Sequence, residues 1–264
     1  MEMKKSPPML IDTHCHVYLE EFDNDRNEVI RRAQEVGVER IFMPALDKNH
    51  FLRLLDVETT YPGVCRPMAG IHPCYVKADY REELDFLQAE LAKRRFAAIG
   101  EIGLDYYWDR TFDHNQMICF REQISMALSA SLPIVIHSRS SMDAVIGVLK
   151  EYKGQGLTGI FHCFSGSYEN ARDVIDCGLL LGIGGVVTYK NAGLAEVVAQ
   201  IDLQHIVVET DAPYLTPVPF RGKRNESSYL KYVVQKIAEV KQADVAEIAA
   251  VTTANALKVF NEPV

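Results

Sequence analysis

The sequence predicts an α/β fold of the (β/α)8, or TIM, barrel class, and three observations carry the prediction. Short apolar segments rich in β-branched residues alternate with helix-patterned segments along the whole chain. Such alternation indicates a parallel sheet with helical crossovers. Eight units in 264 residues fit a closed barrel, typically about 250 residues long, better than an open sheet. No glycine-rich phosphate-binding loop follows the first strand, which argues against a dinucleotide-binding or P-loop fold.

Each expected strand is an apolar run that ends at a polar residue, a glycine or a proline, and a helix follows it. The strands cover 9–13, 40–43, 67–71, 97–99, 134–136, 159–161, 179–183 and 206–208. The helices cover 25–36, 50–59, 82–94, 113–131, 141–152, 168–177, 192–200, 227–240 and 244–260. Leu84, Leu87 and Leu91 show the helical spacing, and Gly37 stops the first helix. We expect residues 1–264 to form a single domain without a linker.

Composition and charge limit the classes of function. A net charge of −8 argues against broad coating of duplex DNA, although local cations can still hold one phosphate. The six cysteines lack metal-finger spacing and fit reduced thiols in a cytoplasmic protein. The N-terminus lacks the apolar core of a secretion signal, and the longest apolar stretch, 178–187, is too short to span a bilayer. We expect no membrane association and see no sign of an obligate protein partner.

Metal-ligand residue types follow five of the expected strands. His14 and His16 lie at alternate positions after the first strand, so both imidazoles point to one face. The C-terminal strand ends of a barrel converge on one mouth, where active sites lie. Burying this many imidazoles and carboxylates without a cation would be costly. The expected ligands are His14, His16, Glu101, His137, His162 and Asp211.

Six ligands are more than one tetrahedral zinc ion needs, and they suit two divalent cations that share a carboxylate. Glu101 is the expected bridge, because Gly100 and Gly103 leave room around it. One ion would take His14, His16 and Asp211, and the other would take His137 and His162. Mixed imidazole and carboxylate ligands favour zinc or manganese over magnesium.

Five motifs then occur in a specific order. They are Asp-Thr-His-Cys-His at 12–16, Gly-Glu-Ile-Gly-Leu-Asp-Tyr at 100–106, His-Ser-Arg at 137–139, His-Cys-Phe-Ser-Gly at 162–166 and Glu-Thr-Asp-Ala-Pro-Tyr-Leu at 209–215. Together they resemble the TatD family of metal-dependent deoxyribonucleases, within the amidohydrolase superfamily, over essentially the whole chain. The resemblance implies a (β/α)8 barrel, two divalent metals shared through Glu101, and 3′-to-5′ exonuclease action on single-stranded DNA, with RNA as a further substrate.

The expected chemistry is phosphodiester hydrolysis by a metal-bound hydroxide. Two bridged metals lower the pKa of a bound water from 15.7 to about 7. Asp211 would orient this hydroxide and take its proton, while Glu101 holds the metals together.

Other residues near the mouth have weaker assignments. Glu209 faces the same way as Asp211 and could orient a ligating histidine, or it could be a core carboxylate. Arg139 could bind phosphate or form an ion pair at the rim. His72 could donate to the substrate phosphate or only cap its strand. Arg221 lies in a basic loop that could follow a nucleic-acid backbone or simply be solvated.

The loop after Glu101 is rich in aromatic residues. Tyr106, Tyr107 and Trp108 could stack on a base or could roof the barrel. We expect Asp105 to cap this turn or hold the loop in place, without a catalytic role.

Two alternatives remain open at this point. One is an amidohydrolase acting on a C–N or carboxylic ester bond; many of these bridge their metals with a carbamylated lysine, where this sequence has Glu101. The other is a non-catalytic module that binds metal or nucleic acid, which the complete set of six ligand types argues against.

Overall fold

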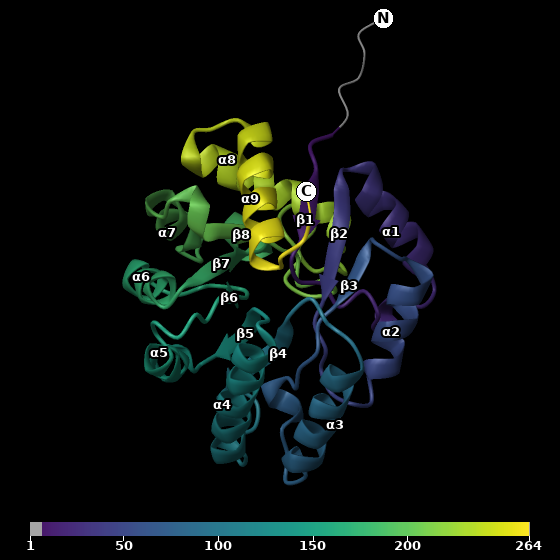
Figure 1. The fold of residues 1–264 in the computed structure, drawn as a ribbon. Helices are drawn as coiled ribbons and strands as arrows, with labels where there is room; N and C mark the ends of the chain where they lie inside the picture. Colours follow the sequence, from purple (N-terminus) through teal and green to yellow (C-terminus); the bar gives the residue numbers. More distant parts are fainter. Residues whose placement is uncertain (1–6, 264) are drawn as a thin grey trace, which may run out of the picture.

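Eight parallel strands form a ring, and helices surround it (Figure 1). The computed structural model describes residues 7–263. The strands are β1 Leu10–Asp12, β2 Val38–Met43, β3 Cys65–Pro67, β4 Ile99–Asp105, β5 Ile134–Arg139, β6 Gly159–Phe161, β7 Leu179–Ile183 and β8 Ile206–Val208. The α-helices are α1 Arg26–Glu35, α2 Phe51–Thr60, α3 Tyr80–Lys93, α4 Asp113–Ala130, α5 Met142–Glu151, α6 Tyr168–Asp176, α7 Leu194–Gln200, α8 Leu230–Lys241 and α9 Val245–Val259. Short 3₁₀ turns are η1 Glu20–Phe22, η2 Pro73–Tyr75, η3 Gly185–Thr188, η4 Leu203–His205 and η5 Ser227–Tyr229.

Two sheets meet at two seams to complete the ring. The first sheet has the order β1-β2-β3 and the second β4-β5-β6-β7-β8. At one seam Ala69 pairs with Ile99, just beyond β3. At the other seam Cys15 pairs with Ala212, beyond the ends of β1 and β8. The predicted (β/α)8 class is confirmed by this topology together with the likeness to solved structures described below.

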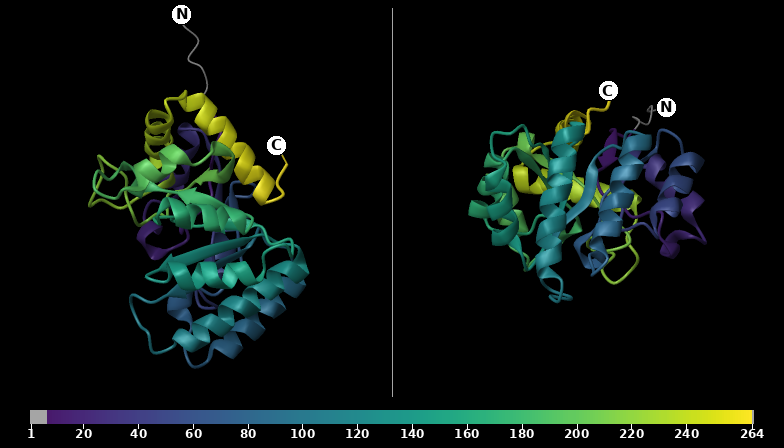
Figure 2. Two further views of the ribbon diagram at one scale, coloured as in Figure 1. Left: turned by 90° about the vertical axis from the view of Figure 1, so that its left-hand side faces the viewer. Right: turned by 60° about the horizontal axis from the view of Figure 1, so that its bottom comes forward.

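The inside of the ring is filled by one apolar residue from, or next to, each strand. These residues are Ile11, Phe42, Met68, Ala98, Val135, Ile160, Leu180 and Val207. The C-terminal end of α9 packs against them, and Phe260 stacks on Phe42 with ring centroids 3.7 Å apart. A helix therefore closes the end of the barrel where the strands begin, and the other end remains for the site. Figure 2 shows α9 from the side.

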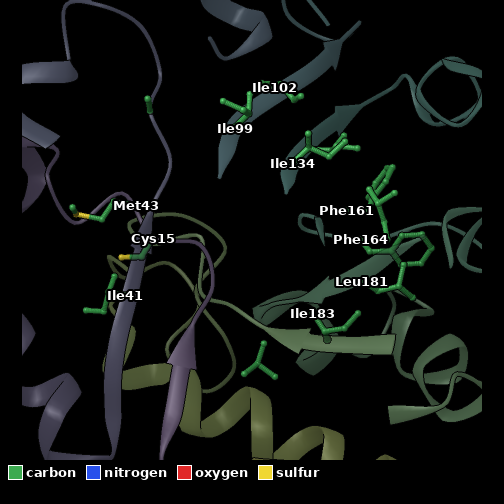
Figure 3. Close-up of a cluster of buried hydrophobic side chains, with 14 of the residues drawn as sticks. Cys15, Ile41, Met43, Ile99, Ile102, Ile134, Phe161, Phe164, Leu181 and Ile183 are labelled. Carbon is green, nitrogen blue, oxygen red and sulfur yellow. The ribbon is translucent and has the colours of Figure 1, made fainter. Parts of the chain in front are cut away.

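A second apolar layer lies between the strands and the surrounding helices. Figure 3 shows part of it, with Ile41 and Met43 on β2, Ile134 on β5 and Leu181 on β7. Side chains alternate faces along a strand, so each strand supplies both layers. Strands buried on both faces explain the nearly continuous apolar runs in the sequence.

The largest differences from the predicted boundaries are in the middle of the chain. The third strand was expected at 67–71 but is β3, Cys65–Pro67, and the fourth was expected at 97–99 but runs through Asp105 as β4. β4 and β5 continue past their apolar runs because β5 lies close against Gly103, where a Cβ would be 2.0 Å from the carbonyl oxygen of His137. No sequence pattern marks such a close approach.

Within residues 7–263, we find no helix with the length and apolar character needed to cross a membrane.

Candidate metal centre

All six expected ligands lie together at the carboxyl ends of the strands. His137 lies on β5, His162 directly follows β6, and Glu209 and Asp211 follow β8. Val135, Ile160 and Val207, two residues earlier on these strands, all belong to the barrel interior. The period of two along a strand therefore points His137, His162 and Glu209 into the barrel. These side chains are buried, with exposed fractions of 0% for His14, 4% for His16, 2% for Glu101 and 4% for His162.

A β-bulge points Glu101 into this cluster. Gly100 pairs with Val135 and Ile102 pairs with Ile136, so Glu101 is an extra residue on β4. A bulge of this kind redirects a side chain and is common beside active sites. The expectation that Gly100 and Gly103 leave room around Glu101 is wrong. A Cβ at Gly100 would meet Val135 at 2.8 Å, so both glycines make room for β5 instead.

The two oxygens of Glu101 face two different groups of ligand atoms. Oε2 lies 3.1 Å from Nε2 of His14 and 3.6 Å from Nε2 of His16. Oε1 lies 3.0 Å from Nδ1 of His137 and 3.9 Å from Nε2 of His162. This geometry suits a carboxylate shared by two cations.

Asp211 faces histidines of both groups. Its Oδ1 lies 3.6 Å from Nε2 of His16, 3.6 Å from Nε2 of His162 and 3.7 Å from Nε2 of His14. The φ angle of Asp211 is +57°, a left-handed conformation that is uncommon for a residue other than glycine. Its amide donates to the carbonyl oxygen of His14 at 2.9 Å, which fixes Asp211 beside the end of β1.

A buried carboxylate beneath the cluster joins the first and last strands. Asp12 is fully buried, and its Oδ1 accepts from the amide of Thr210 at 3.0 Å. Its Oδ2 accepts from the hydroxyls of Thr210 at 2.6 Å and Ser227 at 2.7 Å. Asp12 therefore holds the two segments that carry His14 and Asp211 in a fixed relation.

Three of the histidines have a partner on the ring nitrogen that faces away from the cluster. Nε2 of His137 is hydrogen-bonded to Oδ2 of Asp105 at 2.9 Å. Nδ1 of His162 lies 2.9 Å from Oε1 of Glu209, an ion-pair distance without hydrogen-bond alignment. An acceptor on one ring nitrogen keeps the proton there and leaves the other nitrogen free to bind a cation. Glu209 lies at the position from which it was expected to orient a histidine. Asp105 caps the loop as expected, because it accepts from the amides of Tyr107 and Trp108, but its contact with His137 was not predicted.

His16 is oriented through a hydroxyl. The hydroxyl of Tyr18 donates to the carbonyl oxygen of Pro44 at 2.7 Å, so it accepts from Nδ1 of His16 at 3.3 Å. Nε2 of His16 is then unprotonated and faces Glu101. Residues 17 and 18 form a turn after this segment, so no strand periodicity in the sequence indicated the contact with Tyr18.

His72 also reaches the cluster, but with the opposite hydrogen arrangement. Its Nδ1 accepts from the amide of Cys74 at 3.1 Å, so in the neutral ring the proton is on Nε2. Burial, with the neighbouring His137, lowers the pKa of His72 to about 3, which keeps the ring neutral. Its Nε2 lies 3.3 Å from Nδ1 of His137 and 3.6 Å from Oε1 of Glu101, so a neutral His72 with this proton presents a hydrogen-bond donor to the cluster.

Both central carboxylates are held in the ionised form. Burial alone would raise the pKa of Glu101, but His14 and other imidazoles hold it well below its usual range. Burial would also raise the pKa of Asp211, yet His162 lowers it. The pKa of His162 rises to about 10 in spite of burial, because of the carboxylates around it. A cation that binds at Nε2 of His162 would therefore displace a proton from this ring.

The donor set fits divalent cations. His14, His16 and Glu101 form one group whose ligand atoms all lie within 4.8 Å of one another, and His14, His162 and Asp211 form another. His137 groups with His72 and Glu101. These groups differ from the expected division, in which His162 shares an ion with His137 and Asp211 shares one with His14 and His16. Imidazole and carboxylate ligands together are typical of zinc and manganese sites.

The chain matches a known protein family over most of its length. Residues 11–261 match the family model for TatD-related DNases. The chain belongs to the TatD family.

Two relatives show how closely this TatD-family chain matches other members. It is 42% identical over 253 residues to the metal-dependent hydrolase YabD of Bacillus subtilis, covering 96% of this chain and 99% of the relative. It is 30% identical over 258 residues to the 3′-5′ ssDNA/RNA exonuclease TatD of Erwinia tasmaniensis, covering 96% of this chain and 100% of the relative. The chain is accordingly a TatD-family metal-dependent hydrolase.

Solved structures agree on the fold. The TatD homologue YjjV of Escherichia coli K12 superposes with a TM-score of 0.89 at 30% identity, over 96% of this chain and 98% of that one. A TatD-family hydrolase of Entamoeba histolytica superposes with a TM-score of 0.85 at 22% identity, over 96% and 98% of the two chains.

The basic residues expected near the mouth of this TatD-family barrel divide into two kinds. Arg224 donates to both oxygens of Asp25, at 2.8 and 2.6 Å, which fits a structural ion pair. The guanidinium of Arg221 instead lies 3.8 Å from the ring centroid of Tyr189, without a hydrogen bond or ion pair among residues 7–263. Arg139 likewise lies over aromatic rings rather than in the rim ion pair considered as an alternative.

Proposed function

We propose that this TatD-family hydrolase cleaves phosphodiester bonds of single-stranded DNA or RNA, one nucleotide at a time from the 3′ end. The main support is the position of Glu101 between two groups of ligand atoms, beside Asp211. The name of the Erwinia relative supports the same substrate class. Unpaired arginines at the rim add cationic groups that match phosphate geometry in an otherwise acidic protein.

The proposed ligands of two divalent cations, zinc, manganese or magnesium, are His14, His16, Glu101, His137, His162 and Asp211. Bound cations would make a water more acidic and would neutralise charge on the phosphate oxygens. Glu101 would serve both cations, because its two oxygens face different groups.

Asp211 is the proposed proton acceptor. It is 14% exposed, whereas Glu101 is 2% exposed, so only Asp211 can pass a proton readily to solvent. In this proposal Asp211 orients the attacking water and takes its proton as the water oxygen bonds to phosphorus. The bond from phosphorus to the leaving 3′ oxygen then breaks, and solvent protonates that oxygen.

His72 is the proposed donor to a non-bridging phosphate oxygen. Its Nε2 carries the proton and faces the space beside Glu101. A neutral donor at this point can stabilise charge that develops on the phosphate without competing for a cation.

The deciding experiment is a metal-titrated digestion of single strands labelled at the 5′ end. We expect products that shorten stepwise from the 3′ end in the presence of zinc, manganese or magnesium. Glu101→Gln should abolish the reaction, and Glu122→Gln, an exposed change on α4, should not alter it.

Two results would contradict the proposal. A ladder of internal cuts would replace the exonuclease with an endonuclease. Hydrolysis of lactones or cyclic amides without any cleavage of nucleic acid would replace phosphodiester chemistry altogether.

The proposal also covers the setting of the reaction. We propose that residues 1–264 act as one catalytic domain in the cytoplasm, without a membrane or obligate protein partner. The six free cysteines fit a reducing compartment.

A further inference from the structure

An exposed cluster of cationic and aromatic side chains lies at the rim of the barrel. The guanidinium carbon of Arg139 lies 3.9 Å from the ring centroid of Tyr107 and 5.0 Å from that of Trp108. Tyr107 is 55% exposed and Trp108 is 68% exposed. The Arg139 guanidinium makes no hydrogen bond or ion pair with any described residue, so its N–H edge is available. We call Tyr107, Trp108 and Arg139 the aromatic platform.

Backbone contacts tie the aromatic platform to the metal centre. Asp105, the last residue of β4, pairs with Arg139, the last residue of β5. One oxygen of Asp105 accepts from the amides of Tyr107 at 3.0 Å and Trp108 at 3.2 Å. The other oxygen lies 2.9 Å from Nε2 of His137. One carboxylate therefore positions a proposed ligand and the platform together.

The distance between the metal centre and the aromatic platform would let one substrate contact both. Arg139 follows His137 by two residues, which corresponds to roughly 7 Å along a strand. A cavity of about 550 Å³ lies next to the platform, lined in part by Tyr106, Ser138 and Ser140. This volume falls in the range of small-ligand sites, and hydroxyls can bond to sugar or phosphate oxygens.

We propose that the aromatic platform stacks on an unpaired base adjoining the scissile phosphate, with the Arg139 edge on the neighbouring phosphate. The inference rests on the proposed function. Aromatic rings accept any base because every base has a π-face, and a guanidinium plane stacks in the same way. A base inside a duplex has both faces covered by its neighbours. The platform therefore favours single-stranded ends over paired ones.

The chain contains a single tryptophan, so its fluorescence reports on the platform directly. The full-length Asp211→Asn protein, loaded with zinc or manganese, prevents turnover during titration. An oligonucleotide with an ordinary 3′ end should quench Trp108. The same strand with abasic sugars at its last two positions should bind at least fivefold more weakly and quench little, and a blunt duplex should behave like the abasic strand.

Substitutions give an independent measure, read by anisotropy of a labelled strand. Trp108→Ala and Tyr107→Ala should each raise Kd about 5- to 150-fold, as alanine substitution at base-stacking sites does. The same substitutions should change Kd for the abasic strand less than twofold. Arg94→Ala is the matched control, since Arg94 lies 4.9 Å over Phe96 just after the C-terminal end of α3, away from the mouth.

The outcomes separate this inference from the proposed function. Equal quenching by the ordinary and abasic strands, or unchanged Kd in both aromatic variants while the wild type digests single strands, overturns the platform alone. Absence of phosphodiester cleavage under every metal tested overturns the proposed function instead. Tight binding of the duplex, with quenching equal to that of the single strand, also refutes the platform.

Discussion

Asp12 provides the sharpest test of how the barrel is closed beneath the site. Replacing it with alanine removes the acceptor for the amides of His14 and Thr210 and for the hydroxyls of Thr210 and Ser227. A buried donor left without a partner costs about 1–3 kcal/mol. The two hydroxyls can turn toward other acceptors, but the amides cannot. We therefore expect Asp12→Ala to lower the free energy of unfolding by about 2–4 kcal/mol at pH 5.

Asp12→Asn is the matched comparison. Its oxygen can accept from the Thr210 amide, and its NH₂ group can donate to both hydroxyls, so every buried group keeps a partner. We expect this variant to stay within about 1 kcal/mol of the wild type at pH 5, because the geometry is preserved. Asp56→Ala, an exposed change on α2, should stay within about 0.5 kcal/mol.

The difference in unfolding free energy between the wild type and Asp12→Asn should depend on pH, and its sign can be worked out. Burial raises the pKa of Asp12 from 3.8 to about 6, although hydrogen bonds from Ser227 and Thr210 act against it. The folded protein thus binds this proton more tightly than the unfolded chain does, and stability falls as pH rises from about 4 to about 6. At about 1.36 kcal/mol per pKa unit, the loss approaches 3 kcal/mol. The unfolding free energy of the wild type minus that of Asp12→Asn should fall by this amount between pH 4 and pH 7.

Urea denaturation with a chelator present measures all of these quantities, because the other titrating groups are common to the variants and cancel in the difference. Two results would refute the reasoning. Equal stability of the alanine and asparagine variants would mean that the hydrogen bonds to Asp12 do not support barrel closure. A pH-independent difference between wild type and Asp12→Asn would mean that the carboxyl is not held in a desolvated position.

Three further predictions concern the site. Asp105→Asn should weaken metal affinity about 10- to 100-fold, because His137 loses the acceptor that orients it; calorimetric titration with zinc checks this, and unchanged affinity would contradict it. Arg221→Ala should reduce the slope of log K against log salt concentration for single-strand binding by about 0.7. Arg224→Ala should leave this slope unchanged, because Arg224 is paired with Asp25. Equal slopes for both variants would argue against a phosphate contact by Arg221. Added zinc or manganese at 100 times its Kd should raise the free energy of unfolding by about 2.7 kcal/mol, and a melting temperature that ignores metal would refute a site preformed in the folded state.

The sequence by itself determined the class of fold and the composition of the site. Apolar runs with β-branched residues, separated by helical patterns, are sufficient to predict strands and crossovers. A parallel strand is buried on both faces, so its own few residues are nearly all apolar and can be recognised without knowledge of the rest of the fold. His14 and His16 were readable as a pair for the same reason, since residues two apart on a strand share a face. Glu101, His137, His162 and Asp211 were readable as ligand residue types that follow four other apolar runs.

Tertiary structure alone decided which atoms meet. The bulge at Glu101 depends on how β4 pairs with β5, and nothing within β4 itself specifies that register. Asp105 behind His137, Tyr18 behind His16 and the proton on Nε2 of His72 all depend on partners outside the apolar patterns. Periodicity reports which face of its own strand a side chain occupies. The partner of each ring nitrogen is set by neighbouring segments across the barrel, and only the folded chain brings those segments together.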